Sequence, residues 1–163
     1  MDFYVKRINA TETHRLRATE LGWLEAYSST SLPEDEHETT LHLGAFLSDA
    51  KTEKLVGILT TLYNKLDYDT NVLINNYDCD KFHWQIRGMA VENSYKNNHV
   101  GSLLLAELQK ILIKAEANLG LWANARANVL LFYQKNGFSV LGNKFHITGI
   151  GDHYKIVKAI QRP

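Results

Sequence analysis

The sequence contains one cysteine, two prolines and no long apolar run. Because Cys79 stands alone, no disulfide can form within the chain, and we expect a reducing, cytoplasmic setting. The stretch that begins at Met1 lacks the basic residues and the long apolar segment of a secretory signal. The longest apolar clusters have the length of a strand rather than of a membrane span. We therefore expect neither a signal peptide nor a transmembrane segment.

An excess of either charge is also missing, since eighteen basic residues balance eighteen acidic ones. This balance gives no general electrostatic reason to expect binding to nucleic acid or to a membrane. The seven histidines lack the spacing of a zinc site, and one cysteine cannot build a thiolate site, so we expect no metal. A length of 163 residues fits a single domain that spans residues 1–163 and buries its own core.

Apolar patterning and turn residues divide the chain into strands and helices. Val100, Leu104 and Leu108 recur at four-residue steps and predict a long amphipathic helix over residues 100–117, while Gly137 stands where a left-handed helix cap belongs. The expected strands are residues 3–8, 41–47, 55–63, 82–91, 119–123, 138–141 and 153–159; the other expected helices are residues 11–20 and 126–136; residues 22–40, with some helical turns, and residues 64–80 are expected to be loops. This order predicts an α/β fold of the mixed α+β type, with a central, mostly antiparallel sheet flanked by helices.

Residues 87–102 are the most informative segment, because an apolar strand, a polar loop and a helix follow one another there. The unpaired amides at a helix N-terminus favour an anion. Gly101 lets a ligand approach the backbone, Lys96 adds a cation, and residues 97–99 tolerate positive φ. Successive N–H groups in such a loop can wrap a pyrophosphate. The alternative is an ordinary polar loop that caps a core helix.

Two stretches resemble the signatures of the GNAT superfamily of acetyl-CoA-dependent N-acetyltransferases. Lys96-x-x-His99-x-Gly101 is similar to the pyrophosphate motif of that family, in which arginine or glutamine precedes two spaced glycines. The run from Tyr133 to Phe138 resembles the end of the family's second signature. The resemblance spans the whole chain and is strongest over residues 85–138. It implies the fold of the family and acetyl-CoA as the co-substrate.

The resemblance also implies which residues hold acetyl-CoA. A strand end contacts the pantetheine arm, the loop and helix start hold the pyrophosphate, and a later strand and helix contact the pantetheine again. His99 departs from the family, which has its first glycine there, so its Cβ narrows the phosphate pocket or its ring contacts a phosphate. Lys96 keeps a positive charge without the bidentate fork of arginine. The expected cofactor-binding residues are Met89, Ala90, Val91, Lys96, Asn97, Asn98, His99, Val100, Gly101, Ser102, Asn124, Arg126 and Asn128.

Acyl transfer to an amine needs a base that takes a proton from the amine and an acid that protonates the departing thiolate. The resemblance places Tyr133 beside the thioester sulfur, as the general acid. Arg126 lies seven residues earlier, so we expect it on the same face of the helix. His83 is the expected general base, although the sequence does not choose between it and three alternatives. These are His42, His153 and Glu36, the last in an acidic run (residues 34–38) that is typical of a solvated surface and can attract a cationic amine.

Three functions fit these residues. The first is an N-acetyltransferase that moves the acetyl group of acetyl-CoA to a primary amine of a small molecule or peptide, by direct attack in a ternary complex. The second is a catalytically degenerate module that binds acyl-CoA as a sensor, which the departure at His99 leaves open. The third is an interaction domain without a cofactor. The sequence identifies neither the acceptor nor the acyl-chain length, and the resemblance leaves a homodimer open.

Overall fold

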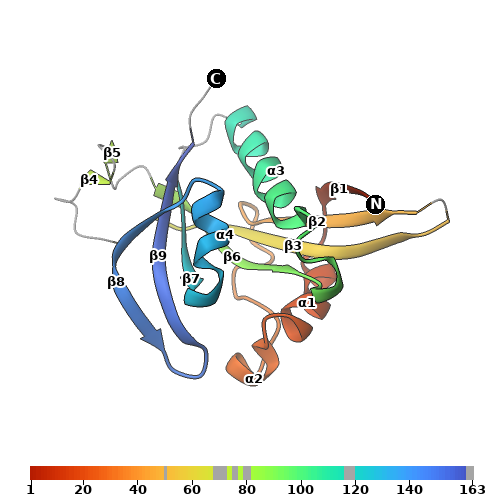
Figure 1. The fold of residues 1–163 in the computed structure, drawn as a ribbon, viewed down its shortest axis with the longest axis horizontal. Helices are drawn as coiled ribbons and strands as arrows, with labels where there is room; N and C mark the ends of the chain where they lie inside the picture. The colour runs from red at the N-terminus through yellow and green to blue at the C-terminus, as the bar shows by residue number, and fades with distance from the viewer. Residues whose placement is uncertain (50, 68–72, 75–76, 79–81, 116–119, 161–163) are drawn as a thin grey trace. The chain divides into compact units, whose positions relative to one another are not determined.

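The computed structural model describes all residues except 50, 68–72, 75–76, 79–81, 116–119 and 161–163, so Cys79 lies outside the described part (Figure 1). The strands are β1 (Asp2–Arg7), β2 (Leu41–Ser48), β3 (Glu53–Tyr63), β4 (Leu73–Ile74), β5 (Tyr77–Asp78), β6 (Phe82–Val91), β7 (Gly120–Arg126), β8 (Ser139–Ile147) and β9 (Gly151–Ala159). The α-helices are α1 (His14–Thr19), α2 (Trp23–Tyr27), α3 (Val100–Lys114) and α4 (Leu130–Lys135), with 3₁₀ turns η1 (Ala10–Thr13), η3 (Asn93–Tyr95) and η4 (Ala127–Val129).

Seven strands form one sheet in the order β1-β2-β3-β6-β7-β9-β8. The pair β6–β7 is parallel, whereas β1–β2, β2–β3, β7–β9 and β8–β9 are antiparallel. The predicted fold class, a mixed and mostly antiparallel sheet with helices, is therefore confirmed. Around this sheet the chain packs as two compact units: unit 1 holds residues 1–62 and 87–110, and unit 2 holds residues 63–86 and 111–163.

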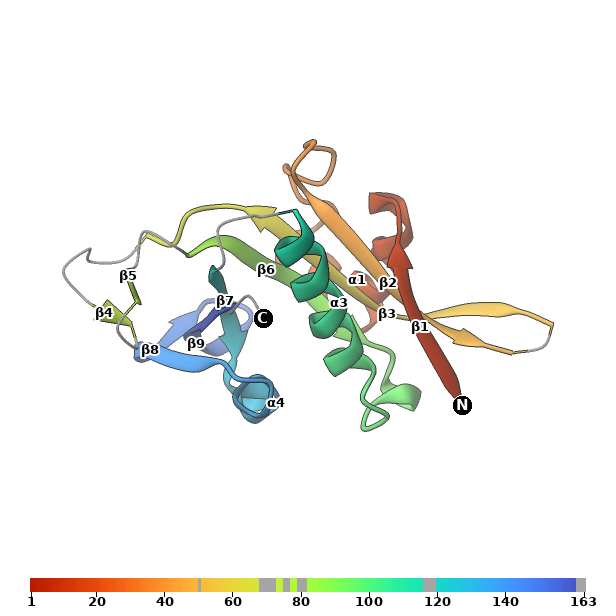
Figure 2. The ribbon, with the colours of Figure 1, turned by 90° about the horizontal axis from the view of Figure 1, so that it is seen from above.

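In unit 1, β1, β2 and β3 lie side by side (Figure 2). The predicted hairpin of β2 and β3 is confirmed, with Leu43 opposite Leu59. A buried cluster of Leu16, Ile58 and Ala90 joins α1 to the sheet. On α3, the predicted stripe is buried at Val100, Leu104 and Leu108. Gly57 permits a close approach of α3 to β3, because a Cβ there would lie 3.0 Å from Val100 Cγ1 and 3.2 Å from Leu104 Cδ1.

In unit 2, β9 lies between β7 and β8. The core of this unit consists of Leu66, Phe82, Trp122, Leu141 and Val157. The end of α4 is fastened to β9, because Lys158 Nζ donates a hydrogen bond of 2.8 Å to the carbonyl of Asn136. Gly137, which follows, has a φ of +90°, so the predicted left-handed cap is confirmed.

Several predicted ranges differ from the structure. The strand expected over residues 138–141 is β8, which continues to Ile147. Residues 64–80, expected to be a loop, contain the short antiparallel pair β4–β5. The strand expected to end at residue 123 continues to Arg126, because residues 124–126 pair with residues 153–155 of β9. Consequently the helix expected from Arg126 begins later, with η4 and then α4 from Leu130. The ladder with β9 decides this boundary, and a single-sequence reading does not contain that information.

Candidate active site

The segment between β6 and α3 has the geometry of an anion site. Asn97 and His99 both adopt left-handed backbone conformations, with φ of +64° and +61°. The side chain of Asn98 donates hydrogen bonds to the carbonyls of Tyr95 (3.3 Å) and Lys96 (3.1 Å), which holds the loop in a tight curve. The first helical bond of α3 runs from the N–H of Leu103 to the carbonyl of His99. Because helix geometry gives the preceding amides no intrahelical acceptor, the N–H groups of residues 100–102 are available to a ligand.

Charged side chains flank this loop. Glu92, at the end of β6, is bound by Lys54 Nζ at 2.7 Å and by Arg15 Nη1 at 3.2 Å. The hydrogen bond from Lys54 is the main reason why the pKa of Glu92 is lowered, so its carboxylate stays ionised and paired. Lys96 Nζ lies 3.9 Å from Glu20 Oε2, and its side chain is 53% exposed. The cation that the sequence assigns to the pyrophosphate is therefore held only loosely by protein groups.

The strand end Met89–Val91 carries one buried and two half-buried residues. Ala90 is 8% exposed and packs with Leu16 and Ile58, so its side chain faces α1. Gly88, which precedes Met89, has a φ of +79°, and a Cβ there would lie 3.0 Å from the Trp23 ring. The irregular backbone at Gly88 therefore lets Trp23 of α2 pack directly against the strand.

Tyr133 occupies the middle of α4 in unit 2 and is 8% exposed. Its ring packs edge-on against Phe132 (centroids 5.2 Å apart) and Phe138 (5.3 Å). Burial raises the pKa of Tyr133 to about 12. The phenol is therefore protonated at neutral pH, which is the state that a general acid requires.

A model of the acetyltransferase (GNAT) domain matches residues 48–140, which is more than half of the chain. The N-acetyltransferase YitI of Bacillus subtilis (strain 168), itself described as uncharacterized, is 27% identical over 157 residues that cover 96% of each chain. The chain belongs to the GNAT acetyltransferase family. Its fold is also that of solved structures of Arabidopsis thaliana NAA60 with acetyl-CoA (TM-score 0.72, 18% identity) and of an aminoglycoside 6'-N-acetyltransferase with coenzyme A (TM-score 0.68, 16% identity), with 98% of this chain and 99% of theirs covered in each case.

GNAT enzymes use acetyl-CoA as a co-substrate, and the β6–α3 segment of this chain fits its pyrophosphate. The left-handed φ of His99 is the conformation that a glycine at this position of the motif adopts without strain. The backbone is therefore shaped for the anion despite the Cβ. Residues 97–102 would hold the pyrophosphate through their amides, with Lys96 supplying a charge. Among the residues that the structure describes, no group of three His, Cys, Asp or Glu side chains forms a metal site.

The structure corrects the expected relation between Arg126 and Tyr133. Arg126 is the last residue of β7, opposite His153 of β9, and has the extended angles φ −59° and ψ 139°. The two residues therefore do not share a helix face, and the seven-residue spacing has no geometric meaning here. Asn124 is an exposed strand residue opposite Lys155, and Asn128 lies in η4.

The candidate bases differ in what surrounds them. His83 Nδ1 lies 3.1 Å from the Tyr63 hydroxyl, and the two rings are 5.7 Å apart. His153 is 4% exposed, and its Nδ1 donates to the carbonyl of Gly151 at 2.7 Å, so Nε2 carries the lone pair of a neutral ring. Glu36 borders an open cavity of about 420 Å³ in unit 1, between the start of η1 and the segment before β2.

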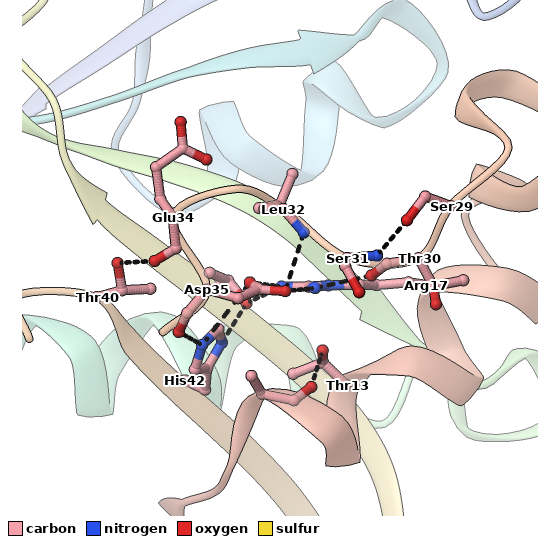
Figure 3. Close-up of polar contacts among 12 residues, drawn as sticks. Thr13, Arg17, Ser29, Thr30, Ser31, Leu32, Glu34, Asp35, Thr40 and His42 are labelled. Carbon is pink, nitrogen blue, oxygen red and sulfur yellow. Dashed lines mark hydrogen bonds and ion pairs between the residues drawn. The ribbon is translucent and has the colours of Figure 1, made fainter. Parts of the chain in front are cut away.

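His42 is engaged at both nitrogens in a buried network that sequence reasoning missed (Figure 3). Its Nε2 donates to the carbonyl of Asp35 at 2.9 Å, so its Nδ1 accepts the Thr60 hydroxyl at 2.8 Å. Thr60 Oγ1 in turn accepts a hydrogen bond of 2.9 Å from Arg17 Nη2. With neither nitrogen open to a substrate, His42 is unsuited to the role of general base.

Arg17 is the centre of this network and is 0% exposed. It forms a bidentate pair with Asp35 at 2.7 and 2.9 Å, donates to the carbonyl of Thr30 at 2.9 Å and lies 4.9 Å from the Trp23 ring. Asp35 is 7% exposed, so the expectation that the whole acidic run is solvated is wrong at this residue. No pattern within the helical segment indicates this network, because the partners of Arg17 lie in the segment before β2 and in β3.

Proposed function

We propose that the chain is an N-acetyltransferase that transfers the acetyl group of acetyl-CoA to a primary amine of a small molecule or peptide, by direct attack in a ternary complex. Acetyl-CoA supplies a thioester whose carbonyl carbon is the electrophile. The amides of residues 97–102 and the ammonium of Lys96 hold the pyrophosphate, and Met89–Val91 align the pantetheine arm. This proposal rests on the loop geometry described above and on the family.

Tyr133 is the proposed general acid, which gives its phenol proton to the departing thiolate. The observation that supports this role is the burial of its phenol, which keeps its proton at neutral pH, at the position that the motif assigns to the general acid. His83 is the proposed general base for the amine, because its ring is half-buried and its Nδ1 lies 3.1 Å from the Tyr63 hydroxyl. A homodimer and a cytoplasmic location stay predictions, as does a single domain over residues 1–163.

The test is release of free thiol from acetyl-CoA in the presence of a panel of primary amines. We expect Tyr133→Phe to lower kcat by about 10²-fold, the lower end of the usual contribution of general acid catalysis. The Kd of CoA should change little, because the hydroxyl acts on the sulfur only during the reaction. Tyr4→Phe, on the exposed face of β1, is the matched control and should keep full activity.

Two results would contradict the proposal in different ways. If Tyr133→Phe turns over as fast as the unmodified chain, Tyr133 is not the general acid. If CoA binds but no amine in the panel releases thiol, the chain is a binding module with respect to that panel.

A further inference from the structure

One face of the β7–β9 ladder in unit 2 carries a row of polar side chains. The ladder is continuous over Gly120–Arg126, so alternate residues of each strand point to the same side. On this face Asn124 stands directly opposite Lys155, and Arg126 stands directly opposite His153. Directly opposite residues have their Cβ atoms about 5 Å apart. Two neighbouring rungs of the ladder therefore gather four polar side chains.

The surface beneath this row is aromatic. Lys155 Nζ lies 4.8 Å from the centroid of the Trp122 ring. Trp122 is 5% exposed and is fixed by a hydrogen bond of 2.7 Å from its Nε1 to the carbonyl of Asn64. The His153 ring stacks on Phe145, with centroids 5.9 Å apart and planes inclined by 27°. Few polar groups on an apolar and aromatic surface are the usual lining of a small-molecule site.

Three of the four polar groups have hydrogen-bonding capacity that the protein does not use. In the part of the chain that the structure describes, the Lys155 ammonium and the Asn124 amide have neither a hydrogen-bond nor an ion-pair partner. His153 is 4% exposed, and its Nδ1 donates to the carbonyl of Gly151 at 2.7 Å, so its Nε2 keeps a lone pair that no described group uses. Buried polar groups without a partner are unfavourable, and a ligand that pairs with them removes that cost.

The charges of the row favour an anion. Burial lowers the pKa of Lys155, but the charge of Asp67 acts in the opposite direction, and the Trp122 ring also favours the ammonium. Asp67 is exposed and forms no ion pair with Lys155 among the described residues, so the ammonium is open to another carboxylate. Arg126 adds a second positive charge on the same face. A carboxylate can accept charge-assisted hydrogen bonds from Lys155 and a further bond from the Asn124 amide.

The lone pair of His153 sets a second requirement, because a neutral ring that donates from Nδ1 can only accept at Nε2. An ammonium group there would be repelled by Lys155 and Arg126, so an uncharged hydroxyl is the better donor. We propose that this row binds a small hydroxy acid, with its carboxylate on Lys155 and Asn124 and its hydroxyl donating to His153 Nε2. The site lies wholly within unit 2 and involves no acetyl transfer, so it can fail or stand separately from the proposed function.

The experiment titrates lactate into the full ¹⁵N-labelled chain and follows the indole N–H resonance of Trp122 by NMR. We expect a saturable shift of this resonance, while that of Trp23 in unit 1 stays in place. Propionate lacks the hydroxyl and should bind about 3–10-fold more weakly, the effect of one lost hydrogen bond, and lactamide, which lacks the carboxylate, more weakly still. A Trp122 resonance that does not respond to lactate, or that responds equally to propionate, would overturn the proposal.

Two lysine variants test the position of the carboxylate. Lys155→Met should weaken lactate binding about tenfold or more, because it removes a charge-assisted hydrogen bond. The matched variant Lys158→Met should leave it unchanged, since Lys158 lies on the other face and donates to the carbonyl of Asn136. Thermal unfolding establishes that both variants are folded, and the ligand series on the unmodified chain decides the question even if one is not. Equal affinities of the two variants would contradict the site.

Inorganic phosphate and CoA distinguish a carboxylic acid from a phosphate as the anion. Both should move the Trp122 resonance less than lactate does at the same concentration. If either moves it as strongly, the row binds a phosphate group, and the assignment to a hydroxy acid fails. A strong response to CoA alone would instead fit the cofactor contact that the family resemblance implies for Asn124.

Discussion

Arg17 brings five N–H donors into the interior of unit 1, and four of them are satisfied by Thr30, Asp35 and Thr60. The fifth, at Nε, has no hydrogen-bond partner in the described part of the chain and faces the Trp23 ring and Gly88. The guanidinium joins α1 to the segment before β2 and to β3. A single side chain therefore fixes three segments that are up to 43 residues apart in sequence.

We predict that Arg17→Met lowers the free energy of unfolding by about 3–5 kcal/mol, because it leaves the Asp35 carboxylate buried without its partner. The double variant Arg17→Met/Asp35→Leu should recover much of this loss, since no unpaired charge remains. Urea unfolding measures both. The control is Lys6→Met, which removes a half-exposed pair with Glu53 and should cost at most about 1 kcal/mol. An Arg17→Met variant that is no less stable than the control would show that the buried pair contributes little.

The same pair makes stability depend on pH. Burial by itself raises the pKa of Asp35, but hydrogen bonds from Arg17 and from the N–H of Leu32, together with nearby positive charge, outweigh it and lower the pKa. A carboxyl group whose pKa is lower in the folded state stabilises the fold above its unfolded pKa of about 3.9. That contribution is lost as the pH falls below about 4 toward the folded pKa. Asp35→Asn should therefore flatten this part of the stability curve.

At the scale of single residues, the motifs singled out Tyr133 and His99. The left-handed backbone of His99 agrees with its motif position, whereas the role of Tyr133 stays a prediction. Arg17 was missed, because it owes its character to contacts with distant segments. No pattern within residues 11–20 specifies that Asp35 lies opposite Arg17.

The strand β6 is the element that carries the expected pantetheine contacts, and its irregular point is Gly88. The φ of +79° is unfavourable for residues with a Cβ, and a Cβ would lie 3.0 and 3.3 Å from two atoms of the Trp23 ring. Trp23 belongs to α2, which is bounded by the left-handed residues Gly22 and Ser28. A change at Gly88 therefore acts on α2 as well as on β6.

We predict that Gly88→Ala destabilises the fold more than Gly149→Ala does. Gly149 has a similar φ of +82°, but nothing lies within 4 Å of a Cβ there, so its substitution costs only the backbone strain, about 1–2 kcal/mol. Gly88→Ala adds a clash with Trp23, and overpacking typically costs a further 1–3 kcal/mol or so. The difference between the two variants in the free energy of unfolding, measured with urea, gives the cost of the clash with Trp23. If both variants lose the same free energy of unfolding, α2 shifts to accommodate the extra methyl group at no energetic cost.

Among the elements, those with strong internal periodicity were predicted best. The strand over residues 82–91 and the start of α3 at Val100 agree with the structure. Predictions failed at β7 and α4, where residues 124–128 alternate polar and small side chains and do not mark where the strand ends. Pairing of residues 124–126 with β9 decides that boundary. The tertiary ladder, rather than local propensity, sets the length of β7.

At the scale of the whole molecule, the fold and the family follow from the order of elements and from two motifs that occur in the expected order. The acceptor does not follow, because no motif in the sequence indicates one. No helix in the described ranges is long and apolar enough to cross a membrane. At this scale, the question that separates the proposed functions is whether the folded chain binds acetyl-CoA.

Binding of acetyl-CoA should raise the melting temperature of the chain. A ligand that binds only the folded state at 100 times its Kd adds about 2.7 kcal/mol of stability. For a domain near this size, each kcal/mol raises Tm by roughly 2–4 °C, so we expect a shift of about 5–10 °C. S-acetyl-N-acetylcysteamine keeps the thioester but lacks the pyrophosphate. It should give a much smaller shift at the same concentration, because residues 97–102 and Lys96 then have no anion to bind. Equal shifts would argue against the β6–α3 loop as the main anchor, and no shift with either compound would favour an interaction domain without the cofactor.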